Sequence, residues 1–262
     1  MTDWGQNLAT MRRNAPLVQN ITNYVAMNVM ANVMLAAGAS PAMVHAEEEV
    51  AEFAGFTPAL TINIGTLSGA WVRSMLLAAK TASARGTPWV LDPVAAGATT
   101  FRRETAAALV ALKPTVIRGN ASEILALSGA GAAGKGVDAA DAVGQAEAGA
   151  RTLARATGSV VAVTGAVDFV TDGTRAFHIA NGHATMPLVT ALGCSLTGIV
   201  GAFLVGQPPL EATVAALAYY GLAGECAAAT AKGPGSFATA FVDALANLTP
   251  AEVSARARVT QA

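Results

Sequence analysis

An aspartate that directly follows an apolar run is the first residue with the right chemistry for a charged ligand. Asp92 comes after Trp89–Leu91 and precedes Pro93. A carboxylate at the end of a strand can hold Mg²⁺, directly or through water, and can offset the charge of a phosphate. An aspartate before a proline can equally cap a turn, so both interpretations of Asp92 stay open at this point.

A second polar segment, Arg118–Glu123, also follows an apolar run. Arg118 has the planar guanidinium that binds phosphate through two hydrogen bonds, and we expect it to face a cleft and pack little. Asn120 and Glu123 are three residues apart at a helix start, so both side chains can point toward one site. The same spacing is that of a capping box, in which Glu123 accepts a hydrogen bond from the backbone of Asn120.

The third segment is a glycine-containing loop that leads into an apolar helix, Thr190–Gly198. Backbone N–H groups at such a helix start bind anions. It contains Cys194, and the helix dipole predicts a lowered pKa for a thiol at this position. The alternative is a buried cysteine that behaves as a small apolar side chain, which is what we expect of the other cysteine, Cys226.

These segments must be positioned by the elements around them, and strand and helix patterns alternate along the chain. The predicted strands are Pro41–Val44, Ala59–Ile64, Pro88–Leu91, Thr115–Ile117 and Ser159–Val163, and Asp172-Gly173 within Phe169–Ile179 predicts a hairpin. The predicted helices are Thr22–Ala37, Glu47–Ala54, Ser68–Arg85, Thr105–Leu112, Ser122–Ser128, Asp138–Thr157, Ser195–Val205, Leu210–Ala231 and Gly235–Asn247.

This alternation predicts an α/β fold with a central, mostly parallel sheet and helices on both of its faces. Ligands of such sheets bind outside the carboxyl ends of the strands. The residues that follow the predicted strands are small, polar or charged, and they are Met43, Gly65, Asp92, Arg118-Gly119-Asn120 and Thr164-Gly165.

Composition excludes several classes of protein. Of the 262 residues, 53% are apolar and 13% charged, and the net charge is −1, which excludes a disordered chain. Two cysteines and three histidines are too few for a disulfide scaffold or a structural zinc site. With 16 basic against 17 acidic residues, there is no basic surface that would indicate nucleic-acid binding.

The mean hydropathy of +0.46 is high, so a membrane protein has to be considered. The longest apolar stretches, Ser195–Gly206 and Ala212–Gly224, fall short of the ~18 residues of a spanning helix. We therefore expect no membrane partner and a cytoplasmic location. The Gly- and Ala-rich patch Ser128–Gly136 is interpreted as an exposed loop rather than a linker, so we expect residues 1–262 to form a single domain.

Seven segments, in this order and approximate spacing, resemble the hydroxyethylthiazole kinase family of the ribokinase-like superfamily, and the resemblance runs from about Pro16 to Leu248. The segments are Asn20-Ile21-Thr22-Asn23, Pro41-Ala42-Met43, Asn63-Ile64-Gly65-Thr66-Leu67, Asp92-Pro93-Val94, Arg118-Gly119-Asn120 with Glu123, Val163-Thr164-Gly165, and Gly193-Cys194. The resemblance implies the ribokinase-like fold and a homotrimer with thiazole sites at the subunit interfaces.

The resemblance also implies roles for individual residues. It implies that Met43 and Asn23 line the substrate pocket, that Arg118 and Thr164 contact ATP, that Asp92 and Glu123 organise Mg²⁺ and phosphate, that Ala191 and Gly193 contact substrate, and that Cys194 is catalytic where most ribokinase-like kinases have an aspartate.

The chain departs from the family pattern at a few positions. The family usually has Gly-Thr-Gly-Cys where this chain has Ala191-Leu192-Gly193-Cys194, and Gln19 and Ala95 stand where His and Gly are usual. A backbone contact at Ala191 is retained in place of glycine only if φ is negative there.

The implied activity is the ATP-dependent phosphorylation of the hydroxyl of 4-methyl-5-(2-hydroxyethyl)thiazole in thiamine biosynthesis and salvage. One alternative is a ribokinase-like dehydratase of hydrated nicotinamide nucleotides, which normally has an aspartate in the place of Cys194. The other is a non-catalytic protein that binds thiazole or nucleotide, which the departure at Ala191-Leu192 keeps open.

Overall fold

The computed structural model describes residues 3–129 and 139–262, and within them one nine-stranded sheet has the order β2-β1-β3-β4-β5-β6-β7-β8-β9. The strands are β1 (Leu17–Ile21), β2 (Ser40–Ala42), β3 (Ala59–Asn63), β4 (Trp89–Asp92), β5 (Val116–Asn120), β6 (Val160–Thr164), β7 (Asp168–Thr171), β8 (Ala176–Ile179) and β9 (Val259–Gln261). All neighbours from β2 to β6 pair in parallel, and the last three strands add antiparallel pairs.

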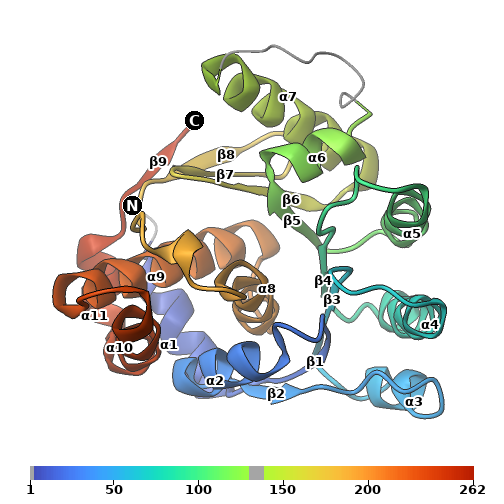
Figure 1. Cartoon of the computed structure of the whole chain (residues 1–262), viewed down its shortest axis with the longest axis horizontal. Helices are drawn as coiled ribbons and strands as arrows, with labels where there is room; N and C mark the ends of the chain where they lie inside the picture. The colour runs from blue at the N-terminus through green and yellow to red at the C-terminus, as the bar shows by residue number, and fades with distance from the viewer. Residues whose placement is uncertain (1–2, 130–138) are drawn as a thin grey trace.

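Helices cover both faces of this sheet (Figure 1). One face carries α3 (Val50–Ala54), α4 (Gly69–Arg85), α5 (Thr100–Val110), α6 (Ala121–Leu127) and α7 (Ala139–Thr157). The other carries α1 (Trp4–Asn14), α2 (Met27–Ala37), α8 (Leu192–Phe203), α9 (Pro209–Thr230), α10 (Pro234–Asn247) and α11 (Pro250–Arg256), with the short 3₁₀ helix η2 (Met186–Leu188) before α8. The prediction of a mostly parallel sheet between two helical layers is confirmed.

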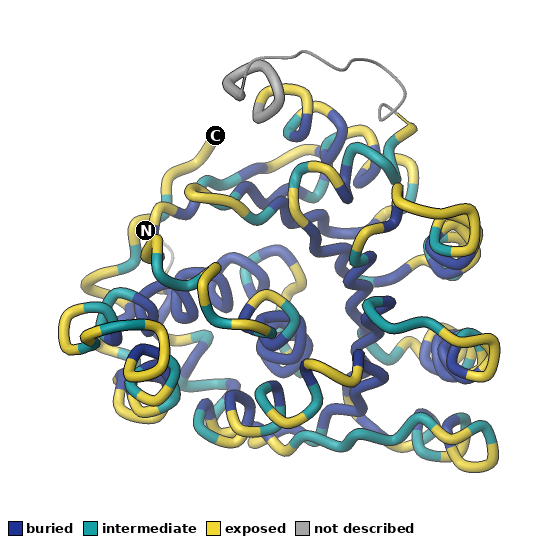
Figure 2. The backbone as a smooth tube through the Cα atoms, viewed as in Figure 1, coloured by how far each residue is buried: buried dark blue, intermediate teal, exposed yellow. Residues whose placement is uncertain are grey.

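The central strands are buried on both sides, as continuous apolar runs in parallel sheets usually are. Every residue of β3 and β4 is buried, and the dark trace through the middle of Figure 2 follows these strands. The outer faces of the helices are exposed. The sheet is therefore a rigid platform, and the edge formed by its carboxyl ends is the part free to carry polar groups.

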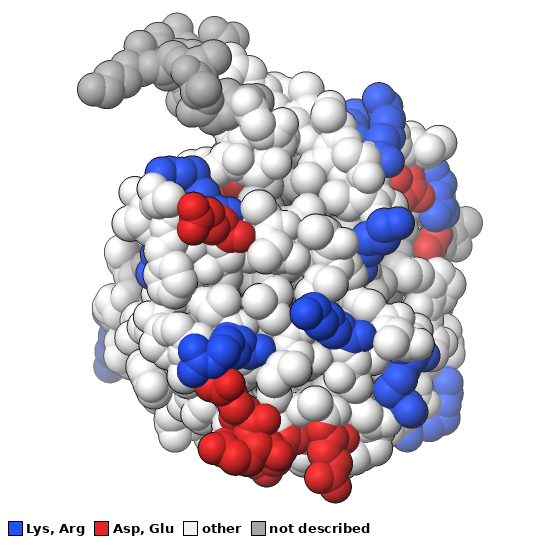
Figure 3. All heavy atoms as spheres, turned by 90° about the vertical axis from the view of Figure 1, so that its right-hand side faces the viewer, with Lys and Arg blue, Asp and Glu red and all other residues white. Residues whose placement is uncertain are grey.

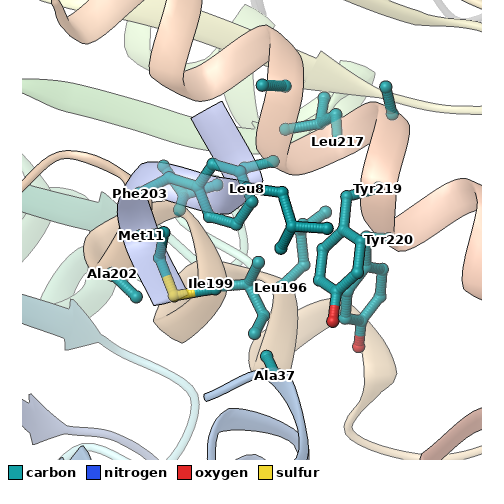
Figure 4. Close-up of a cluster of buried hydrophobic side chains, with 14 of the residues drawn as sticks. Leu8, Met11, Ala37, Leu196, Ile199, Ala202, Phe203, Leu217, Tyr219 and Tyr220 are labelled. Atoms are coloured by element: carbon teal, nitrogen blue, oxygen red, sulfur yellow. The ribbon is translucent and has the colours of Figure 1, made fainter. Parts of the chain in front are cut away.

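Helix α8 lies closest to the sheet because glycine allows it to. A Cβ placed on Gly201 would be 2.6 Å from Cγ2 of Thr61 on β3. Around α8, apolar side chains of α1, α2 and α9 complete the main core, with Leu8, Met11, Phe203 and Tyr219 among its largest members (Figure 4). The position of the α8 N-terminus over the sheet thus depends on this close contact.

Helix α1 closes over the C-terminal end of the chain. Its apolar side chains Trp4, Leu8 and Met11 are buried, and Gly5 lies so close to Pro250 of α11 that a Cβ would be 2.0 Å from the carbonyl oxygen of that proline. Arg12 donates to the carbonyl oxygens of Leu245 and Leu248, both at 2.7 Å. The first and last helices therefore form one packed unit.

Among the described residues, five elements went unpredicted, namely α1, β1, η2, α11 and β9. Strand β1 was missed because Gln19 and Asn20 interrupt its apolar pattern; in the fold their amides are buried and bonded, Gln19 to the carbonyl of Val44 and Asn20 to Thr61. Helix α2 begins at Met27 and not at Thr22, because the side chain of Asn23 accepts a hydrogen bond from the Ala26 amide and holds a turn before the helix.

Other predictions on the fold have mixed outcomes. The Asp172-Gly173 hairpin is confirmed as β7 and β8. Helix α8 begins at Leu192, three residues before the predicted start, which places Cys194 inside its first turn. The predicted loop Ser128–Gly136 and the predicted start of α7 at Asp138 fall largely outside the described residues.

No helix in the described part of the chain has the length and hydropathy needed to cross a membrane. On the face that carries α3, α4 and α5, basic side chains are spread out, and acidic ones form a larger group at the bottom of the view and smaller groups at the upper left and right (Figure 3).

Close packing of α8 leads to a stability prediction. Gly201→Ala should lower the free energy of unfolding by about 1–3 kcal/mol, because Thr61 is a stiff β-branched residue that cannot yield. The control is Gly198→Ala in the same helix, where the added Cβ meets the flexible side chain of Met34 and should cost less. Denaturant unfolding of both variants measures the difference, and equal losses would contradict this account of α8.

Candidate active site

The polar residues of the site lie at the carboxyl edge of the sheet, and strand register brings several of them together. Asn63 and Asp92, the last residues of β3 and β4, are aligned partners. Asn120 of β5 is likewise aligned with Thr164 of β6. Arg118 is two residues before Asn120, so its side chain lies on the same face of the sheet as that of Asn120.

Asp92 is the centre of a buried hydrogen-bond network. Its Oδ2 atom accepts from Nδ2 of Asn63 at 2.7 Å, from Oγ1 of Thr197 at 2.8 Å and from Nη1 of Arg118 at 3.4 Å. Only 1% of the residue is exposed. Burial raises the pKa of Asp92 to about 6, although the Arg118 charge and the two neutral donors oppose that rise.

Arg118 connects this network to the start of α8 and to β6. Its Nη1 donates to the carbonyl oxygen of Gly193 at 2.8 Å, and its Nη2 donates to Oγ1 of Thr164 at 2.9 Å. The expectation that Arg118 packs little is wrong, since the residue is only 8% exposed. Its Nε is buried without a hydrogen-bond partner among the described residues, and a donor left in this way suits an anionic ligand.

Glu123 forms the capping box that the spacing allowed. Its Oε2 accepts from the amide of Asn120 at 2.8 Å, and the Asn120 side chain accepts from the Glu123 amide at 3.0 Å. Its Oε1 accepts from the amide of Ala95 at 3.0 Å, in the loop after Asp92. The carboxylate thus fixes the loops after β4 and β5 to each other, and its charge raises the pKa of Asp92 further.

The thiol of Cys194 is held by two asparagines. Nδ2 of Asn23 is 3.2 Å from Sγ of Cys194 and 2.9 Å from Oδ1 of Asn63, to which it also donates. The prediction of a lowered pKa for Cys194 is wrong. Burial and the nearby negative charge of Asp92 raise the pKa of this thiol, and Asn23, Asn63 and Arg118 offset the rise only in part. The side chain is therefore a neutral thiol at pH 7.

The turn before Cys194 has an unusual backbone conformation at Ala191, where the family usually has glycine. Ala191 has φ of +65° and ψ of −1°, in the left-handed region, so the condition of a negative φ is not met. An alanine there carries about 1–2 kcal/mol of strain that glycine would not. Ala95, the other alanine that stands where the family usually has glycine, also has a positive φ, of +54°.

A cavity of about 690 Å³ opens next to this turn and contains four of the predicted site residues: Arg118, Thr164, Ala191 and Gly193. Its apolar walls include Leu196, Leu217 and Tyr220, and Asp168 adds a carboxylate. Desolvation raises the pKa of Asp168 to about 6, against the opposing effects of the Gly165 amide and the Arg118 charge. One positive group, one carboxylate and an apolar wall make this cavity suitable for a nucleotide.

The remaining predicted residues lie outside the lining of this cavity. Asn23, Asp92 and Cys194 join it through the network described above. Met43 lies apart, directly after edge strand β2, where it is half-buried against the main core, and its carbonyl oxygen is 3.2 Å from Nδ1 of His45. Within the described residues, no side-chain hydrogen bond connects Met43 to Cys194.

The carboxylates at this edge of the sheet are compatible with a Mg²⁺ ion that is also bound by water and substrate phosphates. No group of three or more His, Cys, Asp or Glu side chains that could hold a metal occurs in residues 3–129 or 139–262. Asp92 and Glu123 are near enough for one charge to affect the other. Mg²⁺ commonly uses one or two carboxylates together with water and substrate phosphates, so this pair fits that role.

Three residues of the candidate site were missed from the sequence: Asn63, Thr197 and Asp168. Asn63 stood in a quoted motif without a role, although it ends a strand beside the one that ends in Asp92. Thr197 is three residues after Cys194, the spacing that puts two side chains on one helix face. Asp168 follows Thr164 after a short turn and accepts from the Gly165 amide at 2.9 Å.

Comparisons with known proteins agree with this geometry. A relative from Cereibacter sphaeroides named hydroxyethylthiazole kinase is 66% identical over 262 residues, with both chains fully covered. One of the same name from Rhizobium leguminosarum bv. trifolii is 62% identical over 260 residues, covering 98% of this chain and 97% of its own.

Solved structures extend the comparison. A hydroxyethylthiazole kinase protein from Pyrococcus horikoshii OT3 superposes with a TM-score of 0.93 at 41% identity over all of both chains. A pyridoxal kinase from Staphylococcus aureus has a TM-score of 0.64 at 16% identity, covering 94% of this chain and 99% of its own, and shares the same fold. The model of the hydroxyethylthiazole kinase family matches residues 8–251, and the chain therefore belongs to the hydroxyethylthiazole kinase family.

Proposed function

We propose that this enzyme transfers the terminal phosphoryl group of ATP to the hydroxyl of 4-methyl-5-(2-hydroxyethyl)thiazole, in thiamine biosynthesis and salvage. Membership of the family supports the reaction. The observation that carries the proposal within this chain is the buried Arg118, whose Nε lacks a partner beside the first turn of α8. A guanidinium and a helix N-terminus together form a site for phosphate.

The cavity beside Arg118 is the proposed ATP site. Arg118 and Thr164 would contact the phosphates, while Ala191 and Gly193 present the backbone at the start of α8. Phosphoryl transfer depends mainly on positioning and on the neutralisation of charge. The first-turn N–H groups of α8 point out of the helix end and stabilise negative charge that develops there.

Asp92 and Glu123 are the residues that would hold Mg²⁺. When bound, the ion supplies positive charge against the phosphate oxygens. The protein's own contribution is to keep Asp92 in place through Asn63, Thr197 and Arg118, and to lock Glu123 between two loops. These carboxylates are therefore prepositioned at the sheet edge between the two proposed substrate sites.

Cys194 is the proposed group nearest the alcohol, with Asn23 and Met43 on the substrate side. Because burial raises the pKa of the Cys194 thiol, it acts as a neutral group that orients the hydroxyl, and not as a thiolate that removes its proton. Asn23 fixes the sulfur through its amide. The methionine thioether suits an aromatic, sulfur-containing ring.

The proposal extends to assembly and location. Large apolar side chains next to Asn23 are exposed, Tyr24 at 66% and Val25 at 59%, and Leu35 on α2 at 60%. Such a patch supports a homotrimer that completes the thiazole pocket across chains. We further propose that residues 1–262 act as one catalytic domain and that the enzyme works in the cytoplasm, where ATP is available.

An ATP-consumption assay with the thiazole alcohol tests the proposed reaction. We expect ADP and the phosphorylated alcohol in equal amounts, and a dependence on added Mg²⁺. Hydrated nicotinamide nucleotide serves as the comparison substrate, because a dehydratase would act on it and leave the alcohol unchanged. Nucleotide binding without turnover of either compound would instead identify a non-catalytic binding protein.

Arg118→Ala should weaken ATP binding by about 1–3 kcal/mol, the usual range for charged hydrogen bonds. It should also lower the melting temperature, because Asp92, Gly193 and Thr164 each lose a hydrogen-bond donor. Titration calorimetry with ATP measures the first effect. Arg73→Ala is the control, since Arg73 forms an exposed ion pair with Glu47, and unchanged ATP affinity in the Arg118 variant would remove this residue from the site.

Cys194→Ala should lower kcat by roughly 10²-fold while ATP affinity stays the same, as expected when a reacting hydroxyl loses its positioning. Cys194→Ser should retain most of the activity, because a hydroxyl can keep the contact with Asn23. Cys226→Ala is the control on the other cysteine. A wild-type kcat in the alanine variant would end the catalytic assignment.

The pH dependence of kcat separates the two roles of the thiol. Since burial raises the pKa of Cys194 above that of an ordinary thiol, a thiolate base would make kcat rise about tenfold per pH unit between pH 7 and 9. A neutral, orienting thiol predicts a nearly flat profile over this range.

A further inference from the structure

One wall of the proposed nucleotide cavity is an irregular segment between β8 and α8. The wall runs from Asn181 to Met186, and the cavity is lined by Asn181, Gly182, His183, Ala184 and Met186 of this segment. Apart from Met186, which begins η2, this segment has no regular secondary structure. Its position must therefore be set by contacts with other elements.

Two glycines on α9 let the wall lie directly against that helix. A Cβ on Gly221 would be 2.5 Å from the carbonyl oxygen of Asn181, and a Cβ on Gly224 would be 2.5 Å from Sδ of Met186. Gly221 and Gly224 are three residues apart and so share one face of α9. Both ends of the wall are thus seated on the same helix face.

The next residue of α9, Glu225, holds the start of the wall with its carboxylate. Its Oε1 accepts from Nδ2 of Asn181 at 3.1 Å and from the backbone amide of Gly182 at 3.0 Å. Burial alone would raise the pKa of Glu225, but Arg258, Gly182 and Asn181 together lower it. Glu225 is therefore an ionised acceptor for two donors of the cavity wall.

Arg258, just before β9, completes this arrangement from the C-terminal end of the chain. Its Nη2 is 2.6 Å from Oε1 of Glu225, and its backbone amide donates to Oδ1 of Asn181 at 2.7 Å. The guanidinium also donates to the carbonyl oxygen of Ala180. Both Glu225 and Arg258 contact the wall, and neither is among the residues that line the cavity.

We propose that Glu225 and Arg258 are positioning residues for the nucleotide: they fix the Asn181–Met186 wall on α9 and so preform the cavity before ATP binds. The inference rests on the proposed function in one respect, that ATP occupies this cavity. A wall that is ordered in advance does not have to be ordered during binding, so its loss weakens binding of the nucleotide specifically. On the thiazole side, Asn23 and Cys194 form no described hydrogen bond with Glu225, Arg258 or the Asn181–Met186 wall.

A matched pair of variants tests the proposal. Glu225→Gln keeps the shape of the side chain and removes its charge, and we expect KM for ATP to rise roughly tenfold while kcat and KM for the thiazole alcohol stay within about twofold. Glu211→Gln is the control. Glu211 is on the same helix, is 2.6 Å from Arg175 with a similar exposure, and lies away from the cavity, so its KM for ATP should stay at the wild-type value.

A second measurement separates failure of this inference from failure of the proposed reaction. The Kd of ADP, measured by calorimetry, should increase in Glu225→Gln by the same factor as KM, whatever the alcohol substrate is. If Glu225→Gln does not fold, Arg258→Lys is measured in its place. The lysine ammonium can keep its contact with Glu225 or with Ala180 but cannot reach both at once, so we expect a smaller increase in the Kd of ADP. Unchanged nucleotide affinity in the folded variant overturns the proposal, and so does an equal increase in both substrate KM values.

Discussion

A single buried carboxylate oxygen organises the polar centre of this protein. Oδ2 of Asp92 receives hydrogen bonds from a strand on one side, a strand on the other and the helix above, through Asn63, Arg118 and Thr197. A buried charge is tolerated only when it is paired and hydrogen-bonded, so these three donors cannot be altered independently. The relative positions of β3, β4, β5 and α8 at the sheet edge follow from this one requirement.

The same network joins the two proposed substrate sides. On the nucleotide side, Arg118 is hydrogen-bonded to Asp92 and also to Gly193 and Thr164. On the alcohol side, Asn63 is hydrogen-bonded to Asp92 and to Asn23, and Asn23 in turn contacts Cys194. The asparagine orientations are set, because each amide nitrogen faces an acceptor and the Asn63 oxygen faces two donors. Phosphoryl transfer requires two reactants in line, and a rigid connection of this kind is a direct way to hold them so.

The sequence predicted the layered α/β architecture, since alternating apolar strands and helices allow few other folds. It also predicted Asp92, Arg118 and Thr164 as neighbours, because parallel strands end at one edge. It did not predict β1, whose buried Gln19 and Asn20 have a polar pattern that only their tertiary partners explain, Val44 and Val50 for Gln19 and Thr61 for Asn20. Nor did it predict the state of Cys194, because the pKa of this thiol depends on its burial and on charges and hydrogen bonds from four separate segments, whereas the helix dipole is visible locally.

Packing of α1 on α11 has a consequence for how the chain is made. The face of α1 that contains Gly5 and Arg12 is translated well before its partners Pro250 and Leu245, which come more than 230 residues later. At synthesis rates of roughly 5–20 residues per second, this face stays uncovered for roughly ten seconds or more on the nascent chain. Helix α1 is thus a natural binding segment for chaperones during translation, until α11 has emerged and covers this face.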